Sequence, residues 1–354
     1  MRKSATPLLI AALLAGVAGP AGAKKDKDAP AATQSSSAAP ENPYPSTYKA
    51  YPGTATAIRG ATIFDGEGGR IDNGVIFLSD GKVTAIGGAD TPIPADIAVF
   101  DGTGKYVTPG VIDIHSHLGN YPSPGVDAHS DGNEATAPVT AHVWAEHSIW
   151  PQDAGFSRAL ANGGVTSLQI LPGSANLFGG RSVTLKNVPA RTMQGMKFPG
   201  APHGLKMACG ENPKRVYGSK GREPSTRMGN MAVNRATWIK ARDYQKKRAA
   251  GKDQSRDLGM ETLADVLEGK ILVHNHCYRA DEMANVIDMG KEFGYRVTAF
   301  HHAVEAYKIA DLLRDNGVCS ALWGDWYGFK MEAYDGIKEN VPLVHRAGAC
   351  TIVH

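Results

Sequence analysis

The sequence predicts an α/β protein: a TIM-type (β/α)8 barrel preceded by a small β-sandwich-like domain. From residue 109 onward, eight apolar, strand-like runs recur, each followed by a loop and usually by a helical stretch. This order is typical of a parallel sheet with right-handed crossovers. The runs span residues 109–354, close to the roughly 250 residues of a typical barrel, which favours a barrel over an open doubly wound sheet. They read VIDIHSH, VTSLQIL, SVTLKN, GLKMAC, ILVHNHC, RVTAFHH, VCSALW and ACTIVH.

The N-terminal residues differ in character from the rest of the chain. Residues 1–23 have a basic start, an apolar stretch and a small-residue ending AGA, typical of a cleaved signal peptide. The apolar stretch is about half the roughly 20 residues that a membrane anchor needs. Residues 24–48, rich in Ala, Ser, Pro and Lys, are predicted to be a disordered leader. We therefore expect an exported protein, periplasmic or secreted, with no membrane contact after signal cleavage.

Residues 49–108 are predicted to form the small β domain, the N-terminal part of a composite sandwich. Their alternating apolar runs are short, and Asp80-Gly81 is a typical hairpin turn. The barrel, residues 109–354, is expected to be incomplete at its C-terminus, because the eighth run ends at the last residue, His354. Helices are predicted at residues 152–161, 225–250, 280–293 and 303–316.

Charge and cysteine content restrict the partners and the chemistry. The formal net charge is only +3, so a nucleic-acid-binding face gets no support and a small molecule is the expected partner. Export would allow the cysteines to pair, yet each lies in or beside an apolar run and none belongs to a C-x-x-C motif. We therefore predict buried thiols that pack as small hydrophobic groups. They are Cys209, Cys277, Cys319 and Cys350.

The histidines carry the functional signal. All 12 occur at or after His115, and six form three tight groups at the C-terminal ends of predicted strands, where barrel enzymes place their active sites. In VIDIHSH, His115 and His117 share one side of a strand, as metal ligands do. Asp113 lies on the same side, where its carboxylate can accept an imidazole N–H.

The other two groups follow the fifth and sixth runs. His274 and His276 share a face; His276 is nearer the strand end and is the better ligand, whereas His274 lies one layer deeper and is predicted to support it. His301 and His302 are adjacent, so only one of them is expected to face the interior. Parity alone does not choose between them.

The motifs TPGVIDIHSHLG, HCYRADEM and HHAVEAYKIADLL together resemble the amidohydrolase superfamily, specifically its imidazolonepropionase-like branch. In that family a (β/α)8 barrel binds one or two divalent metals. The ligands are H-x-H of strand one, a Lys or Glu of strand four, one His each from strands five and six, and an Asp of strand eight. The resemblance implies that His115, His117, His276 and His302 are metal ligands, and that His276 and His302 are also the catalytic histidines. Zinc is the expected ion, with iron or manganese as alternatives.

Strand four offers two candidate ligands. Lys206 lies where many members of the family carry a carbamylated lysine, and burial of an amine depresses its pKa, which favours that modification. Glu211, beyond the strand end, can ligate without modification, so both stay open. The family's strand-eight Asp, which would ligate metal and shuttle a proton, is expected shortly after TIVH. The chain is therefore expected to be truncated before it.

The resemblance implies a metal-dependent hydrolase in which a metal-activated hydroxide cleaves a C–N bond. The substrate is expected to be an amide or a cyclic amide, as for an imidazolonepropionase or a dipeptidase. Two other functions stay open: a deaminase or lactonase on the same metal cage, and a non-catalytic metal- or ligand-binding relative that lacks the catalytic Asp. Barrels of this kind are often homo-oligomers.

Substrate contacts are expected from the loops after the strands. Arg279 and Tyr278 follow the fifth run and suit a carboxylate, with a structural salt bridge as the alternative for Arg279. Arg181, in a segment rich in Gly and Ser after the second run, is either an anion contact or part of a plain connection. Trp323 and its aromatic neighbours either wall the pocket or pack against loops.

Overall fold

The computed structural model describes residues 42–252 and 255–354. The chain divides into two units, residues 1–43 and residues 44–354, and the description that follows concerns the second. The predicted signal peptide and the predicted leader up to residue 41 lie outside the described residues. Within the described part of the chain, no helix is both long and apolar enough to cross a membrane.

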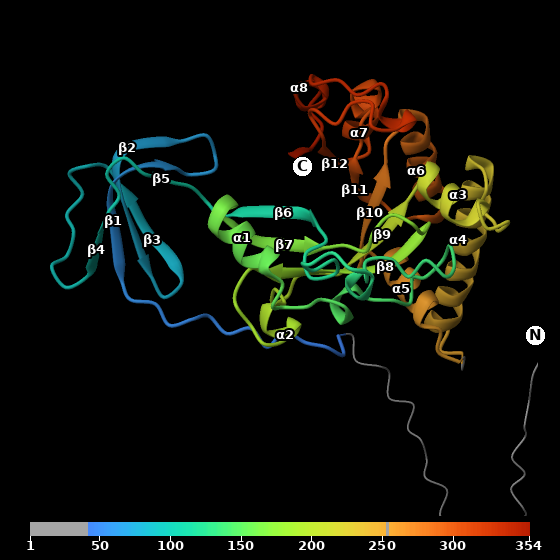
Figure 1. Cartoon of the computed structure of the whole chain (residues 1–354), viewed down its shortest axis with the longest axis horizontal. Helices are drawn as coiled ribbons and strands as arrows, with labels where there is room; N and C mark the ends of the chain where they lie inside the picture. Colours follow the sequence, from blue (N-terminus) through green and yellow to red (C-terminus); the bar gives the residue numbers. More distant parts are fainter. Residues whose placement is uncertain (1–41, 253–254) are drawn as a thin grey trace, which may run out of the picture. The chain divides into compact units, whose positions relative to one another are not determined.

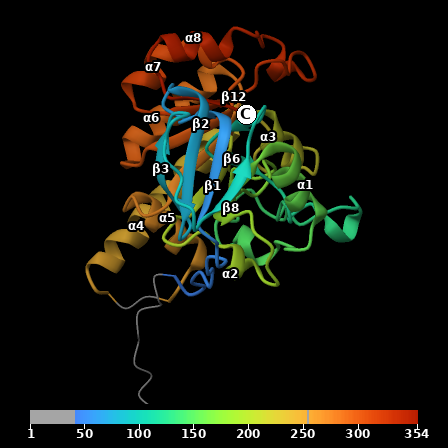
Figure 2. The same cartoon turned by 90° about the vertical axis from the view of Figure 1, so that its left-hand side faces the viewer.

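The first sheet is formed by residues 56–107. Its strand order is β3-β2-β1-β4, with β5 also paired to β1. Neighbouring strands among β1, β2 and β3 are antiparallel, and these three lie side by side in Figure 2. Strands β4 and β5 run parallel to β1. Asp80 and Gly81 have positive φ angles of 51° and 73° and join β2 to β3, as predicted for this hairpin. The strands are β1 (Thr56–Phe64), β2 (Arg70–Ser79), β3 (Lys82–Gly87), β4 (Ala98–Asp101) and β5 (Tyr106–Val107).

The second sheet contains all eight of the predicted runs. Its strands follow one another in chain order from β6 to β13 (Figure 1). They are β6 (Val111–Ser116), β7 (Val165–Ile170), β8 (Phe178–Lys186), β9 (Gly204–Ala208), β10 (Leu272–Cys277), β11 (Val297–His302), β12 (Cys319–Leu322) and β13 (Thr351–Val353).

The prediction of a wholly parallel sheet is wrong at β8, which runs antiparallel to both β7 and β9. A parallel connection needs a crossover of roughly a dozen residues or more. Only residues 171–177 separate β7 from β8, so the chain turns back directly instead of crossing over. The other neighbours in this sheet pair parallel, and their carboxyl ends therefore meet at one edge.

The sheet is curled. Its edge strands β6 and β13 share no hydrogen-bonded ladder in the described part of the chain. Even so, the ring centroids of His115, on β6, and His354, directly after β13, are 4.7 Å apart. A flat sheet of this width would hold its edges tens of ångströms apart, since neighbouring strands are about 4.8 Å apart. The arrangement is thus α/β with a curled eight-stranded sheet, consistent with a barrel.

Helices pack on the outside of β8–β11. Trp238 of α4 is fully buried, where it contacts Phe178 of β8 and stacks on Tyr295. The predicted helices correspond to α1, α4, α6 and the pair η3–α7, whereas α2, α3, α5 and α8 were not predicted. The α-helices are α1 (Ala154–Gly163), α2 (Met193–Met196), α3 (Glu211–Gly218), α4 (Arg227–Ala249), α5 (Leu258–Leu267), α6 (Ala280–Phe293), α7 (Ala310–Asp315) and α8 (Asn340–Arg346); the 3-10 helices are η1 (Asp127–His129), η2 (Ala145–His147), η3 (Ala306–Ile309) and η4 (Met331–Ala333).

All four cysteines are paired, so the prediction of buried thiols is wrong. Cys209, just after β9, bonds to Cys277 at the end of β10, with their Cα atoms 5.2 Å apart. Cys319, at the start of β12, bonds to Cys350, just before β13, with their Cα atoms 4.4 Å apart. Neighbouring parallel strands bring matched positions to the spacing that a disulfide needs. The partner cysteines are far apart in the sequence, so the sequence alone does not indicate that they are close in space.

Residues 42–48, the end of the predicted leader, lie within the described residues. Residues 44–51, which we call the N-terminal strap, lie along the segment around α2. The Thr47 N–H donates to the Gln194 carbonyl (2.9 Å), and the Lys197 ammonium donates to the Tyr44 carbonyl (2.8 Å). Lys197 also pairs with Glu146 at 2.6 Å, and both side chains are buried. The strap therefore packs over a buried ion pair.

We predict that Lys197→Met lowers the free energy of unfolding by about 3 kcal/mol or more, because it leaves the Glu146 carboxylate buried without its cation. Urea unfolding measures this change. Lys291→Met is the matched control, because Lys291 pairs with Asp288 at the surface. That substitution should cost no more than about 0.5 kcal/mol. Equal effects of the two substitutions would contradict the prediction.

Candidate metal centre

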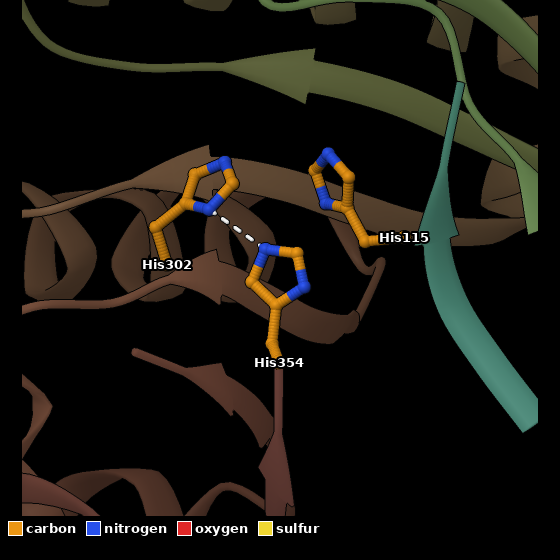
Figure 3. Close-up of side chains that lie close together, drawn as sticks. All are labelled: His115, His302 and His354. Atoms are coloured by element: carbon orange, nitrogen blue, oxygen red, sulfur yellow. Dashed lines mark hydrogen bonds between the residues drawn. The ribbon is translucent and has the colours of Figure 1, made fainter. Parts of the chain in front are cut away.

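Seven histidines from four strands meet at the carboxyl edge of the curled sheet. Six of them form three pairs, each at the end of one strand, and the seventh, His354, directly follows β13. Figure 3 shows three of them, His115, His302 and His354, with the His302 and His354 rings in contact (Nδ1 to Nε2, 3.0 Å). The cluster comprises His115 and His117 of β6 and its end, His274 and His276 of β10, His301 and His302 of β11, and His354.

The backbone after β11 lets two adjacent histidines face the same space. His302 and Ala303 have φ angles of +70° and +37°, in the left-handed region that L residues seldom adopt. The usual alternation of a strand would turn one of the two imidazoles outward. Instead the ring of His301 lies 4.7 Å and that of His302 4.8 Å from the ring of His115. The expectation that only one of the pair faces the interior is therefore wrong.

A continuous line of hydrogen bonds joins five polar side chains of the site, of which His274 and His301 are buried and the others are partly buried. Each imidazole in the middle of the line uses both of its ring nitrogens, one toward each neighbour. The contacts are Gln169 Nε2 to His274 Nε2 (3.1 Å), His274 Nδ1 to His301 Nε2 (3.0 Å), His301 Nδ1 to His115 Nδ1 (2.9 Å), His115 Nε2 to His117 Nε2 (3.3 Å) and His117 Nδ1 to the Leu171 carbonyl (2.8 Å).

The two ends of this line fix the direction of donation. A carbonyl only accepts, so His117 carries its proton on Nδ1, and its Nε2 presents a lone pair. At the other end the Gln169 amide donates to His274. With every ring neutral, a single assignment then satisfies all the contacts: each imidazole accepts from the side of Gln169 and donates toward Leu171.

Burial keeps the rings neutral. Desolvation, with a smaller contribution from the nearby Lys206 ammonium, lowers the pKa of His117 and of His274 to about 4. The pKa values of His115, His276, His301 and His302 lie well below the ordinary value of 6.5, chiefly because of burial. At neutral pH the cluster thus presents nitrogen lone pairs, the form in which histidine binds metal.

Lys206 lies under the cluster and is fully buried on β9. Desolvation lowers the pKa of its ammonium to about 7, and its Nζ donates to the Pro172 carbonyl (3.0 Å). Its charge contributes to lowering the pKa of every cluster histidine. Lys206 is therefore the basic side chain that the histidines surround.

Glu211, the other strand-four candidate, lies at the start of α3. Its carboxylate faces Lys330 (Nζ to Oε1, 3.6 Å), and its backbone N–H donates to Glu332 (2.7 Å). Its neighbour Asn212 contacts the cluster, since Asn212 Nδ2 lies 3.3 Å from His276 Nε2. The structure thus brings Lys206 into the cluster and leaves Glu211 beside it in an ion pair.

The donor set fits a divalent ion. Within the described residues, one group of three or more metal-ligating side chains has all its ligand atoms within 4.8 Å of one another: His115, His302 and His354. His276 Nδ1 is buried without a hydrogen-bond partner. A buried ring nitrogen left unpaired is costly unless something binds it. Neutral imidazoles are preferred ligands of zinc and similar ions.

Two expectations about supporting residues can be compared with the structure, and two further cluster residues were not among the predicted ligands. His274 lies one layer below the cluster surface, hydrogen-bonded to His301. Asp113 was expected to accept an imidazole N–H, but its carboxylate accepts the backbone N–H of His115 (2.9 Å). His354 was not predicted as a site residue, although its position at the end of the eighth run is the signal that could have identified it. His301 was named as the alternative to His302, and the resemblance favoured His302; the structure brings both rings to His115.

The proposed substrate residues have different surroundings. Tyr278 is buried, its ring centroid 4.8 Å from that of His276, with the Lys330 ammonium 3.9 Å above it. Arg279 is partly exposed and makes a bidentate salt bridge with Asp281 (2.9 Å), the alternative noted from the sequence. Trp323 packs on His302, with ring centroids 4.0 Å apart.

The expectation that Arg181 lies in a loop is wrong, because it lies within β8. Its guanidinium is buried, donates to Thr262 of α5 (2.8 Å), pairs with Asp265 (3.5 Å) and stacks on Trp144. These contacts fasten α5 to the sheet. The antiparallel turn of β8 explains the error, since the Gly-rich segment before Arg181 reads as a loop.

A cavity of about 340 Å³ is connected to the cluster through two of its wall residues. The Asn120 N–H donates to the His117 carbonyl (3.0 Å), and the Pro172 carbonyl accepts from Lys206. The other polar residues that line the cavity are Ser130, Asp131, Asn133, Glu134, His147 and Ser148, and no cluster histidine is among them. The cavity can therefore hold a small polar molecule one residue away from the cluster.

Comparison with known proteins identifies relatives of this arrangement. A solved structure of an amidohydrolase from Thermotoga maritima MSB8 aligns with a TM-score of 0.78 at 36% identity, covering 84% of this chain and 77% of that one. "Amidohydrolase tasK" of Hapsidospora irregularis is 30% identical over 308 residues, 80% of this chain. An imidazolonepropionase of Idiomarina loihiensis is 40% identical over 63 residues, 17% of this chain and 15% of its own length.

The chain spans only 31% of the length of the tasK protein. No protein-family model matches this chain.

We predict that the metal-free protein loses stability as the pH falls from 6.5 toward 4. The cluster histidines have lowered pKa values in the folded chain, so below pH 6.5 the unfolded chain binds protons that the folded chain does not. Several histidines act together, and the free energy of unfolding should therefore fall by more than the roughly 1.4 kcal/mol per pH unit of a single proton. Urea unfolding of chelator-treated protein at a series of pH values measures the slope. A flat profile between pH 6.5 and 5 would contradict the assignment of buried neutral rings.

Proposed function

Because the chain belongs to the amidohydrolase family, we propose that it is a metal-dependent hydrolase that cleaves the C–N bond of an amide or cyclic amide. The observation that carries the proposal is the buried cluster of neutral imidazoles around Lys206, next to a polar cavity. The family relationship rests on the 36% identical Thermotoga structure, of which the chain covers 77%. The finer assignment to an imidazolonepropionase-like branch draws support from a short match only.

The ligands proposed are His115, His117, His276 and His302, together with Lys206. A bound divalent ion, zinc in the first instance, lowers the pKa of a water molecule toward about 7 and polarises a substrate carbonyl. Lys206 is preferred to Glu211 because its charge acts on every cluster histidine, whereas Glu211 is engaged by Lys330. With a pKa of about 7, Lys206 is partly neutral at physiological pH, as carbamylation by carbon dioxide requires.

The chain's own side chains position the substrate and handle its protons. His276 and His302 face one another, with ring centroids 4.7 Å apart, and an imidazole N–H from either can stabilise a developing oxyanion or protonate the leaving nitrogen. The His117 N–H to Leu171 bond holds that ring in one tautomer. Tyr278 and Trp323 pack around His302 and keep water from its outer face.

The substrate proposed is small and polar. Its reacting carbon lies by the cluster, and its remaining groups occupy the cavity beyond Asn120. Arg279 is available for a substrate carboxylate only if it leaves Asp281. A peptide-like or cyclic amide offers the donors and acceptors that this lining matches.

We also propose that the protein is exported. The two disulfides support this, since stable pairs of this kind form in oxidising compartments and are rare in the cytosol. Mass spectrometry of the protein purified from its native host measures the mature N-terminus, which is expected at residue 24. An intact N-terminal methionine in the mature protein would overturn the proposal.

We predict that the purified protein carries between one and two equivalents of zinc or a similar ion and that His117→Ala removes both metal and activity. Elemental analysis measures the metal, and hydrolysis of imidazolonepropionate and of a dipeptide panel measures the activity. His129→Asn is the control, because the partly buried His129 contacts the Pro124 carbonyl and Trp150 instead of the cluster. A metal-free but fully active preparation would refute the proposed function. Full retention of metal by His117→Ala would mean that the ligands are misassigned.

A further inference from the structure

We propose that the Cys209–Cys277 disulfide positions the metal centre, holding the ends of β9 and β10 at the separation that the ligands require. The inference rests on the proposed function, because it concerns the same cluster. The disulfide does not contact the metal position itself. It acts through the residues on either side of each cysteine.

Both cysteines adjoin site residues directly. Cys277 lies between His276 and Tyr278, and Cys209 lies two residues before Glu211. The Cys209 N–H donates to the His276 carbonyl (2.8 Å), so a hydrogen bond and a covalent bond fasten the same two strand ends.

The disulfide closes a short ring of chain at the site. From His276 the path runs through Cys277, the sulfur bridge and Cys209 to Asn212, whose amide lies 3.3 Å from His276 Nε2. This ring fixes α3, which starts at Glu211, relative to the ligand on β10. Metal ligands must be held within about 0.5 Å of their required positions. The covalent bond between Cys209 and Cys277 therefore restrains the position of the ligand His276.

The junction between β9 and α3 makes a turn that only glycine allows. Gly210 has φ +80° and ψ −151°, a conformation that is essentially restricted to glycine. A Cβ at Gly210 would lie 2.6 Å from the Glu332 carboxylate, so the backbone passes close to that buried acid. The Gly210 carbonyl accepts from Asn230 Nδ2 (3.0 Å), and the Glu211 N–H donates to Glu332 (2.7 Å). The disulfide directly before Gly210 adds a covalent restraint to these hydrogen bonds.

The second disulfide is a natural control. Cys319 and Cys350 also join neighbouring parallel strands, β12 and β13, but at their amino ends. His302 pairs with Leu322 at the far end of β12, so the Cys319–Cys350 bridge adjoins no cluster histidine on that strand. Both disulfides close loops, of 68 and 31 residues, and each restrains the unfolded chain. Only the Cys209–Cys277 bridge lies directly next to a cluster histidine in the chain, whereas Cys350 and His354 lie at opposite ends of β13.

The test is a cobalt(II) titration of the metal-free protein, read from the visible ligand-field spectrum at a temperature at which every variant is folded by circular dichroism. We compare the full chain with the double variants Cys209→Ala/Cys277→Ala and Cys319→Ala/Cys350→Ala. Loss of either disulfide should lower the thermal midpoint. Only the Cys209/Cys277 variant should lose cobalt affinity, by about tenfold or more, as removal of a group that supports a ligand does. Its spectrum should also change.

Equal cobalt affinity and identical spectra in the two double variants would overturn the proposal, leaving the Cys209–Cys277 bridge a purely stabilising one. If Cys209→Ala/Cys277→Ala does not fold, Cys209→Ala/Cys277→Val replaces it, since the added methyl groups fill the buried space left by the sulfurs. The cobalt affinity and the spectrum of this variant are then compared with those of the Cys319→Ala/Cys350→Ala variant. Failure of the unmodified protein to bind cobalt would count against the proposed function and is therefore a separate outcome.

Discussion

The site depends on keeping a dense group of imidazoles uncharged. A protonated ring in this buried space would lack a counter-ion, and burial accordingly moves the pKa values of the cluster down. Neutral rings can satisfy one another only if donors and acceptors alternate, which is what the line from Gln169 to Leu171 achieves. The polar ends of that line, an amide and a carbonyl, therefore matter as much as the histidines between them, because they set which nitrogen of each ring carries the proton.

The second requirement of the site is that the histidines meet in one place, and the sheet brings them together. Parallel strands end at a common edge, so histidines far apart in the sequence reach the same place. Curling then brings His354 to His115 from opposite edges of the sheet. Lys206, on the central strand β9, lies beneath the histidines and is desolvated with them. The amine of Lys206 and the imidazoles that would bind metal therefore share one buried environment.

Sequence periodicity was sufficient for part of this arrangement. Period-two spacing placed His115 with His117 and His274 with His276, and the eight apolar runs matched eight strands. It failed where geometry departs from the average: a left-handed turn at His302 overrode parity, and β8 reversed because its connection was too short for a crossover. Disulfides and the packing of the strap depend on contacts between distant segments, which a single sequence does not encode locally. The choice between Lys206 and Glu211 likewise needed the burial of each side chain.

The ordered strap has a practical consequence for anyone who prepares this protein. Its residues precede the first strand and would be trimmed by a boundary drawn at Thr56, yet Tyr44 covers Trp144 and His147, and Tyr51 donates to the Pro189 carbonyl. A recombinant version that starts at the first strand would expose that aromatic surface and invite self-association. Affinity tags and protease sites are better placed ahead of residue 42, where the strap keeps its contacts.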